Sequence, residues 1–140
     1  MVKVDNREVA LMSIHPIYAE KILSGKKQVE FRKTLLKKDV KYILIYATSP
    51  KKKLVGYFNV LGIEIDTPKA IWDKYSDVGC VDNRFYWSYY GGKDRAVAIK
   101  VGSVFELRNP IDLNTILDKN PPQSYYYLDS NTVELFLGYL

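Results

Sequence analysis

The sequence predicts an α+β fold, namely a small mixed or antiparallel β-barrel of about five strands flanked by short helices. Segments rich in β-branched and aromatic residues occur between short segments of helical periodicity. They follow one another irregularly, without the repeated strand–helix–strand unit of a doubly wound sheet. The length of 140 residues suits one domain, and no linker or internal repeat divides the chain. We therefore expect a single domain over residues 1–140.

The composition is that of a soluble, folded protein. Hydrophobic residues make up 47% of the chain and charged residues 26%, within the usual range for globular domains. One cysteine, Cys80, cannot form an internal disulfide, and with a single histidine it cannot build a Cys/His zinc site. Residues 1–10 lack the apolar core of a signal peptide, and no apolar stretch reaches membrane-spanning length. We expect a cytoplasmic protein with no cofactor, no metal and no membrane partner.

The first two strands and the first helix are predicted close to the amino terminus. Residues 8–14 form a short apolar run, which predicts a strand and ends at His15-Pro16. Proline is well tolerated in the first turn of a helix, so a helix should begin there, and Gly25 should end it. Polar and apolar residues then alternate over residues 27–33, as in a half-buried strand.

The middle of the chain predicts a pair of neighbouring antiparallel strands. Residues 41–48 and 53–65 are strongly β-forming. Ser49-Pro50 and the lysines that follow provide a turn between them.

Helices and one long strand are predicted in the second half. Thr67-Pro68 combines a good N-cap with proline in the first turn, which predicts a helix start. Residues 83–90, closed by a Gly-Gly pair, predict another short helix. Residues 95–107 predict a long strand, because small and β-branched residues alternate along it. A proline-containing loop and a short helix over residues 133–140 should complete the chain.

Aromatic residues are concentrated in two clusters. Five of them occupy nearly consecutive positions of one predicted helix, so at most half can face one core; they are Phe85, Tyr86, Trp87, Tyr89 and Tyr90. Residues 125–127 are all tyrosine, and alternation on a strand would place the middle one opposite its neighbours. With the net charge of +5, exposed rings would give single-stranded RNA a stacking surface, whereas packing in the core is the alternative.

A motif lies where the first helix ends and the second strand begins. The segment SIHPIYAEKILSGKKQVEFRK contains Gly25, Lys27, Glu30 and Arg32 in the spacing G-x-K-x-x-E-x-R. On this motif the chain resembles the ASCH domain family of the PUA-like superfamily, and the resemblance continues through IYATSP, KLVGYFNV and the later PPQSYYYL. It implies a PUA-like barrel, a cleft lined by the motif's lysine, glutamate and arginine, and a role in RNA metabolism.

Lys27, Glu30 and Arg32 are the candidate catalytic residues. Glu30 and Arg32 lie two apart on one strand face, so they can pair or converge on a ligand. A carboxylate beside a guanidinium offers the acceptors and donors that a base edge requires. In a hydrolysis, Lys27 with a lowered pKa could activate water or act as the nucleophile, and Glu30 could carry the proton. Arg32 could stabilise the oxyanion or a phosphate. The structural alternatives are a barrel salt bridge for Glu30 and Arg32 and a solvated turn lysine for Lys27.

Other polar residues near predicted strand ends are candidates for contacting a ligand. His15 could act as a proton shuttle or as a helix cap. The candidate ligand-binding residues are Ser13, His15, Tyr46, Thr48, Ser49 and Tyr125. Basic loop residues could contact phosphates, although solubility also requires loop lysines; they are Lys51, Lys52 and Lys53, together with Lys37, Lys38 and Lys41.

Three functions remain open from the sequence. The first is a domain that binds single-stranded RNA or a modified nucleoside. The second is a hydrolase. Some members of the resembled family are similar to N4-acetylcytidine amidohydrolases, and others have been described as ribonucleases. The amidohydrolase members carry a threonine where this chain has Glu30. The third is a protein-interaction module that uses the tyrosine-rich surface. The oligomeric state and the position of any second catalytic carboxylate are left open.

Overall fold

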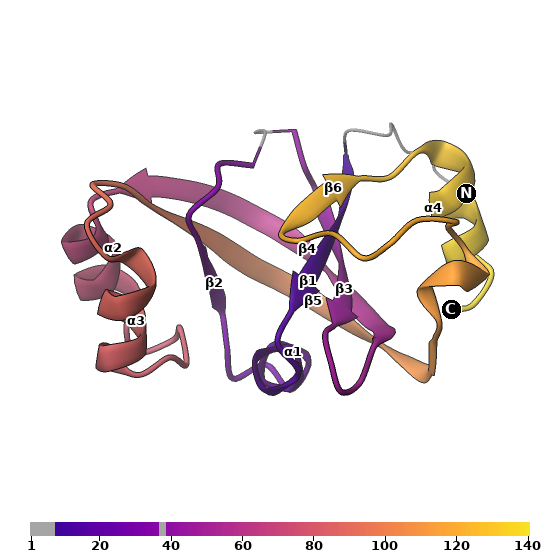
Figure 1. The fold of residues 1–140 in the computed structure, drawn as a ribbon, viewed down its shortest axis with the longest axis horizontal. Helices are drawn as coiled ribbons and strands as arrows, with labels where there is room; N and C mark the ends of the chain where they lie inside the picture. The colour runs from indigo at the N-terminus through magenta and orange to yellow at the C-terminus, as the bar shows by residue number, and fades with distance from the viewer. Residues whose placement is uncertain (1–7, 37–38) are drawn as a thin grey trace.

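The computed structural model describes residues 8–36 and 39–140, which form one curled six-stranded sheet with four α-helices (Figure 1). The order of strands across the sheet is β2-β5-β4-β3-β1-β6. In chain order the elements are β1 (Val9–Ile14), α1 (Pro16–Leu23), β2 (Val29–Arg32), β3 (Tyr42–Ala47), β4 (Lys53–Asp66), α2 (Pro68–Tyr75), α3 (Asn83–Tyr90), β5 (Ala96–Ile111), the 3₁₀ turn η1 (Leu113–Thr115), β6 (Tyr125–Tyr127) and α4 (Ser130–Leu137).

The pairing of the strands confirms the predicted α+β class. Strands β3 and β4 are antiparallel neighbours, as expected for the two β-forming segments around Ser49-Pro50. Strands β4 and β5 form the longest pair, and β1 and β3 are the parallel pair. Figure 1 shows α2 and α3 at one end of the β4–β5 pair and α4 at the other.

The described residues form six strands where about five were expected. The additional strand, β6, is three residues long and pairs with β1 in antiparallel fashion. Three residues are the lower limit of strand length, so the alternation of side chains in this segment is too short to predict a strand. Its tyrosines do alternate as predicted, because Tyr125 and Tyr127 pack against one core cluster and Tyr126 against another.

The sheet is a half-barrel whose two edges, β2 and β6, are joined by side chains rather than by a strand ladder. The Arg32 guanidinium on β2 donates from Nη2 to the carbonyl oxygen of Ser13 at 2.6 Å. The Tyr125 hydroxyl on β6 donates to the carbonyl oxygen of Leu35, which follows β2, at 3.1 Å. These contacts bring residues far apart in the sequence to the same side of the molecule.

Three hydrophobic clusters hold the elements together. The first lies inside the curl of the sheet and includes α1 residues, the second lies under α4, and the third lies between β2, β5 and the helices α2 and α3. The aromatic cluster of α3 divides as predicted. Tyr86 and Tyr90 are buried in the third cluster, whereas Phe85 and Trp87 are exposed.

Several element ends differ from the expected ones. Helix α4 begins at Ser130, three residues before the predicted helix, because the Asp129 carboxylate caps it by accepting from the Thr132 amide at 2.8 Å. Strand β2 begins at Val29 rather than at residue 27. The Lys27 amide donates to the Lys21 carbonyl instead of joining the ladder. The turn before it uses Gly25 at φ +85°, as expected for a glycine that ends a helix.

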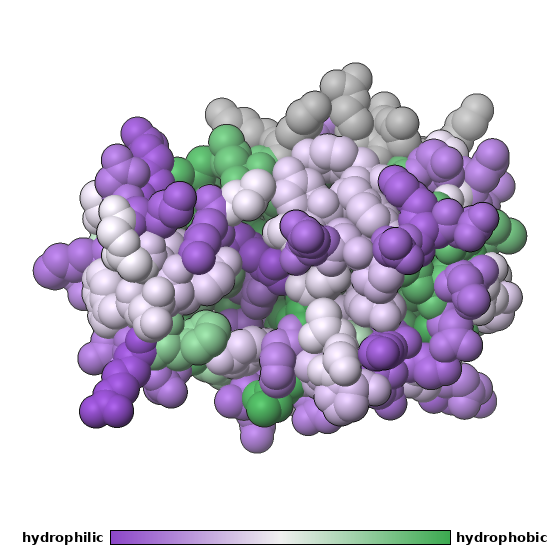
Figure 2. Space-filling view, viewed as in Figure 1, coloured by the Kyte–Doolittle hydropathy of each residue, from purple (hydrophilic) through white to green (hydrophobic). Residues whose placement is uncertain are grey.

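The face seen in Figure 2 is covered mainly by hydrophilic side chains, with hydrophobic ones in separate small areas. Over residues 8–36 and 39–140, no helix combines the length and the apolar character that crossing a lipid bilayer requires.

Candidate functional site

A hollow of about 170 Å³ lies between α1, β2 and α3. The predicted motif forms its floor, since Lys27, Glu30 and Arg32 all line it. The aromatic residues of the two helices form its walls. The complete lining is His15, Tyr18, Lys27, Glu30, Phe31, Arg32, Val81, Phe85, Tyr86 and Tyr89.

Lys27 is buried, with 1% of the residue exposed, which excludes the solvated turn lysine considered from the sequence. Its ammonium donates to the Gly79 carbonyl oxygen and lies 3.7 Å from Glu30 Oε1. The rings of Tyr18 and Phe31 lie 5.1 and 5.2 Å from the same nitrogen. Burial lowers the pKa of Lys27 from its ordinary value, because the charged form loses hydration, and the Glu30 carboxylate opposes that shift.

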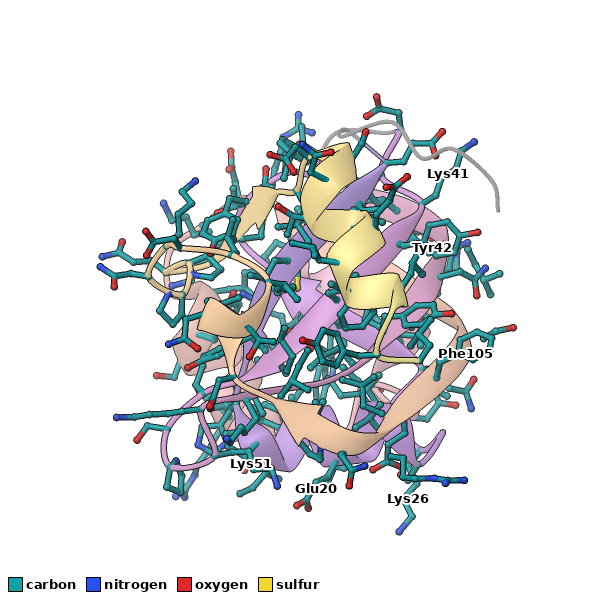
Figure 3. All side chains as sticks on the ribbon, turned by 90° about the vertical axis from the view of Figure 1, so that its right-hand side faces the viewer. Glu20, Lys26, Lys41, Tyr42, Lys51 and Phe105 are labelled. Atoms are coloured by element: carbon teal, nitrogen blue, oxygen red, sulfur yellow. The ribbon has the colours of Figure 1, made fainter. Side chains whose placement is uncertain are left out.

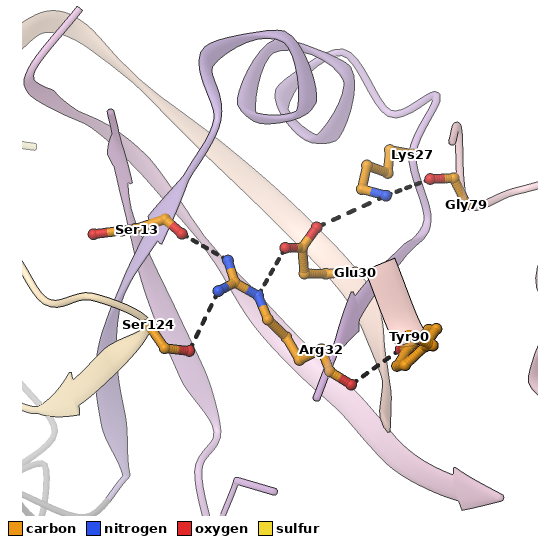
Figure 4. A network of polar contacts seen from close by, with 7 residues as sticks. All are labelled: Ser13, Lys27, Glu30, Arg32, Gly79, Tyr90 and Ser124. Carbon is orange, nitrogen blue, oxygen red and sulfur yellow. Dashed lines mark hydrogen bonds and ion pairs between the residues drawn. The ribbon is translucent and has the colours of Figure 1, made fainter. Parts of the chain in front are cut away.

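Glu30 lies between the two cations of the motif (Figure 4). Its Oε2 accepts from Arg32 Nε at 2.9 Å, and its Oε1 faces Lys27. The side chains of Glu30 and Arg32 are 8% and 13% exposed. The predicted pairing of Glu30 with Arg32 is therefore present, and Oε1 has acceptor capacity left for a group entering the hollow.

Arg32 is held by partners from three other parts of the chain. Its Nη2 donates to the Ser13 carbonyl at 2.6 Å, and its Nη1 to Ser124 Oγ at 3.4 Å. Its own carbonyl oxygen accepts from the Tyr90 hydroxyl at 3.0 Å. The first two contacts fix the guanidinium at the edge of the half-barrel and at the floor of the hollow, and the third holds the main chain of β2 against α3 (Figure 4). Arg32 thus has a structural role as well as a place in the site.

His15 lies at the rim of the hollow as the N-cap of α1, and it is exposed. Its Nδ1 accepts from the Ile17 amide at 3.4 Å, and its ring centre lies 5.9 Å from that of Tyr18. The capping interpretation is therefore realised in the structure. The proton-shuttle interpretation stays a prediction, and Nε2 is the nitrogen that could serve it.

The structure does not bring the remaining candidates into the hollow. Tyr46 is buried in the cluster under α4. The hydroxyl of Ser13 donates to the Pro122 carbonyl, so only its main chain reaches Arg32. Thr48 and Ser49 lie at the β3–β4 turn, and Tyr125 joins the sheet edges through Leu35.

The candidate phosphate-contacting lysines lie at the same turn, away from the lining of the hollow. Lys51 points into solvent (Figure 3), and Lys52 is exposed as well. Lys53 forms an ion pair with Asp112 at 2.6 Å. Lys37 and Lys38 lie outside the described residues.

Several contributors to the site were not found from the sequence. Gly79, Tyr90 and Ser124 reach the motif from 52, 58 and 92 residues away in the chain. No role in the site was predicted for Tyr18, which lies in the first turn of α1 and forms part of the wall. In the part of the chain that the structure describes, no group of three or more His, Cys, Asp or Glu side chains could hold a metal ion.

Comparison with protein families finds a match to the ASCH domain over residues 12–105. An ASCH domain-containing ribonuclease from Zymomonas mobilis is 31% identical over 133 residues, which cover 91% of this chain and 89% of that protein. The large ribosomal subunit protein uL22 of Ureaplasma parvum is 34% identical over 125 residues. That match covers 89% of this chain and 40% of the relative, so this chain spans less than half the length of that protein.

Comparison with solved structures also finds ASCH proteins similar to this chain. The crystal structure of the ASCH protein from Zymomonas mobilis superposes with a TM-score of 0.87 at 29% identity, covering 94% of this chain and 95% of that one. A serine-to-alanine variant of that protein gives a TM-score of 0.88. The predicted barrel-type α+β fold is therefore confirmed.

Proposed function

The chain belongs to the ASCH domain family, and from that premise we propose that it binds single-stranded RNA or a modified nucleoside in the hollow over Lys27, Glu30 and Arg32. One observation carries the proposal, namely a buried polar floor beneath an aromatic wall. A nucleobase has the matching features, because it combines flat faces that stack with an edge of hydrogen-bond donors and acceptors.

The floor offers both kinds of hydrogen-bonding group to such an edge. Glu30 Oε1 can accept from a ring or amino N–H, since its contact with Lys27 is an ion pair at 3.7 Å. The Lys27 ammonium and the Arg32 guanidinium carry more N–H groups than the contacts described above use, so both can donate to a carbonyl or ring nitrogen. The rings of Tyr18, Phe85 and Tyr89 supply the stacking surface.

The overall charge supports the same partner. The chain carries a net charge of +5, which attracts a polyanion and makes the affinity depend on salt. A reducing, cytoplasmic setting stays a prediction; the single cysteine, Cys80, which is free, is compatible with it.

A pair of phenylalanine variants tests the location of binding. Phe85 is 45% exposed and stacks on Tyr89 in the wall of the hollow, with ring planes at 12°. Phe105 is 49% exposed and stacks on Tyr57 near α4, with ring planes at 14°. Phe85→Ala should weaken binding of a fluorescein-labelled single-stranded RNA by about 1–3 kcal/mol, the usual contribution of one stacked base. Phe105→Ala, the matched control, should leave fluorescence anisotropy titrations unchanged. Equal losses in the two variants would contradict the proposal.

A second candidate function is hydrolysis of RNA or of an acylated nucleoside. It is favoured by the Zymomonas mobilis relative, which is named a ribonuclease and is covered over 89% of its length. It is also supported by the burial of Lys27, which lowers the pKa of this amine and makes its neutral, basic form more accessible. Lys27 would then take up a proton, and Arg32 would stabilise the negative charge that develops.

Turnover distinguishes the two candidates. The purified protein would be incubated with single-stranded RNAs and N4-acetylcytidine, and the products followed by mass spectrometry. An enzyme should give products that disappear in both Lys27→Ala and Glu30→Gln. Product formation that survives Lys27→Ala removes this amine from the mechanism. Salt-sensitive retention of RNA without any product would support binding as the function and exclude hydrolysis of the RNAs and nucleoside tested.

A further inference from the structure

The wall of the hollow is a continuous series of rings from two helices. The ring centres of Tyr18 on α1 and Phe85 on α3 lie 5.9 Å apart, and those of Phe85 and Tyr89 lie 6.0 Å apart. All three rings line the hollow. A wall of this kind stacks bases without regard to their identity, because every base has a π-face.

The series ends at Lys33, which has no acidic partner within residues 8–36 and 39–140. The ammonium of Lys33 lies 4.5 Å from the ring centre of Tyr89, and Lys33 is exposed. Among the residues that the structure describes, no carboxylate lies within ion-pair distance of Lys33. By contrast, four other exposed or half-buried lysines are each paired with an acid; they are Lys41, Lys53, Lys69 and Lys74. Lys33 therefore keeps a full charge available beside the wall.

The floor does not repel a phosphate. Its one carboxylate, Glu30, has a cation on each side, with Lys27 facing Oε1 and Arg32 bonded to Oε2. With Lys27 in its ammonium form, the three side chains together carry one net positive charge. An anion near the hollow thus meets Lys33 beside the Tyr89 ring and an excess of positive charge at the floor.

The size of the hollow limits what can enter. A volume of about 170 Å³ is close to the roughly 150 Å³ in which an engineered protein cavity holds one benzene molecule. One base fits with its face on the wall, and the sugar and phosphate then stay at the rim.

We propose that the hollow takes a nucleotide together with its phosphate rather than a free nucleoside, with the base against Tyr18, Phe85 and Tyr89 and the phosphate on Lys33. This inference rests on the proposed function of base binding and adds the chemical class of the ligand. It places the phosphate contact at Lys33, where the sequence had suggested Lys51, Lys52 and Lys53. A charge-assisted hydrogen bond from one ammonium accounts for a preference of about tenfold.

The test compares nucleosides with nucleotides by isothermal titration calorimetry. Cytidine and uridine, and their 3′- and 5′-monophosphates, would be titrated into the wild type, Lys33→Gln and Lys119→Gln. Lys119 is a matched control, because its ammonium also lies 4.5 Å from a tyrosine ring centre, that of Tyr126, outside the hollow. The wild type and Lys119→Gln should bind a monophosphate about tenfold more tightly than the nucleoside. Lys33→Gln should lose that preference and keep the affinity for the nucleoside.

Three outcomes would overturn the inference. Equal affinity of the wild type for a nucleoside and its monophosphates, or a preference that survives Lys33→Gln, refutes the phosphate contact while base binding stands. A failure of every probe to bind at millimolar concentration refutes the inference and the proposed function together.

Discussion

At the scale of single residues, the burial of Lys27 governs the chemistry of the site. The amine is surrounded by the rings of Tyr18 and Phe31 and by the Gly79 carbonyl, with Glu30 as its acidic neighbour. Loss of hydration and the attraction of Glu30 act on its pKa in opposite directions, and loss of hydration dominates. The ionisation of Lys27 therefore depends on Glu30 in a direction that can be measured.

Glu30→Gln should lower the pKa of Lys27 further. The substitution removes the negative charge that favours the ammonium form, whereas the burial that disfavours it remains. Titration of the lysine ε-carbon resonance by NMR reports this pKa in both proteins. An unchanged or raised pKa in Glu30→Gln would show that the carboxylate does not act on Lys27 as described.

At the scale of elements, Arg32, which is paired with Glu30 on β2, joins this strand to the opposite edge of the half-barrel. Arg32 connects β2 with Ser13 at the end of β1 and with Ser124 just before β6. A buried pair adds little net stability compared with an apolar replacement, but loss of one partner leaves the other charge buried and unpaired. The pair therefore couples the integrity of the sheet edges to that of the site.

Arg32→Ala should lower the free energy of unfolding by about 3–5 kcal/mol, because Glu30 would keep only the more distant Lys27 as a partner. The Ser13 carbonyl would also lose its donor. Lys69→Ala is the control, since its pair with Asp73 is exposed and should contribute less than 1 kcal/mol. Urea denaturation followed by circular dichroism gives both values. A loss in Arg32→Ala no larger than that in Lys69→Ala would show that the pair does not hold the edges together.

The cap of the last helix is a second feature at this scale. Asp129 accepts from the Thr132 amide, and this bond also lowers the pKa of its carboxyl. Asp129→Ala should destabilise the protein by about 1 kcal/mol, whereas Asp129→Ser, which keeps a capping oxygen, should cost little. Thermal unfolding of the two variants provides the comparison. Equal destabilisation by Ala and Ser would exclude the capping bond as the cause.

The sequence predicts several helices and strands and the three motif residues, but it does not predict the long-range partners of the motif. Local patterns predict α3 over residues 83–90, the proline starts of α1 and α2, and the β3–β4 pair, because caps, turns and periodicity act over a few residues. The motif predicts Lys27, Glu30 and Arg32 together. The partners Gly79, Tyr90 and Ser124 could not be predicted, since only the closure of the sheet brings them to the motif.

At the scale of the whole molecule, some of the positively charged side chains are neutralised by ion pairs and others are not. Lys53 is paired with Asp112, whereas Lys51 and Lys52 at the same turn have no ion pair within the described ranges. Under the proposed function, these two lysines are therefore candidates for contacts with RNA phosphates outside the hollow.

Binding of single-stranded RNA should weaken as salt rises, and the double variant Lys51→Gln, Lys52→Gln should show a shallower dependence. Each lost phosphate contact reduces the slope of log affinity against log salt by about 0.7. Lys53→Gln is the control, because Asp112 already neutralises Lys53. Anisotropy titrations between 50 and 300 mM potassium chloride, roughly the range in which such contacts are resolved, give the slopes. Parallel slopes for the wild type and the double variant would remove the turn from the binding surface.

The central claim is that RNA enters the hollow between α1, β2 and α3. The most direct measurement is a ¹H–¹⁵N NMR titration with a short single-stranded RNA, in which the perturbed amides locate the contact. The account predicts the largest shifts at residues 15–18, 27–33 and 79–89, which line the hollow or neighbour its lining. Shifts concentrated instead near Tyr57 and Phe105, with the hollow unperturbed, would contradict it.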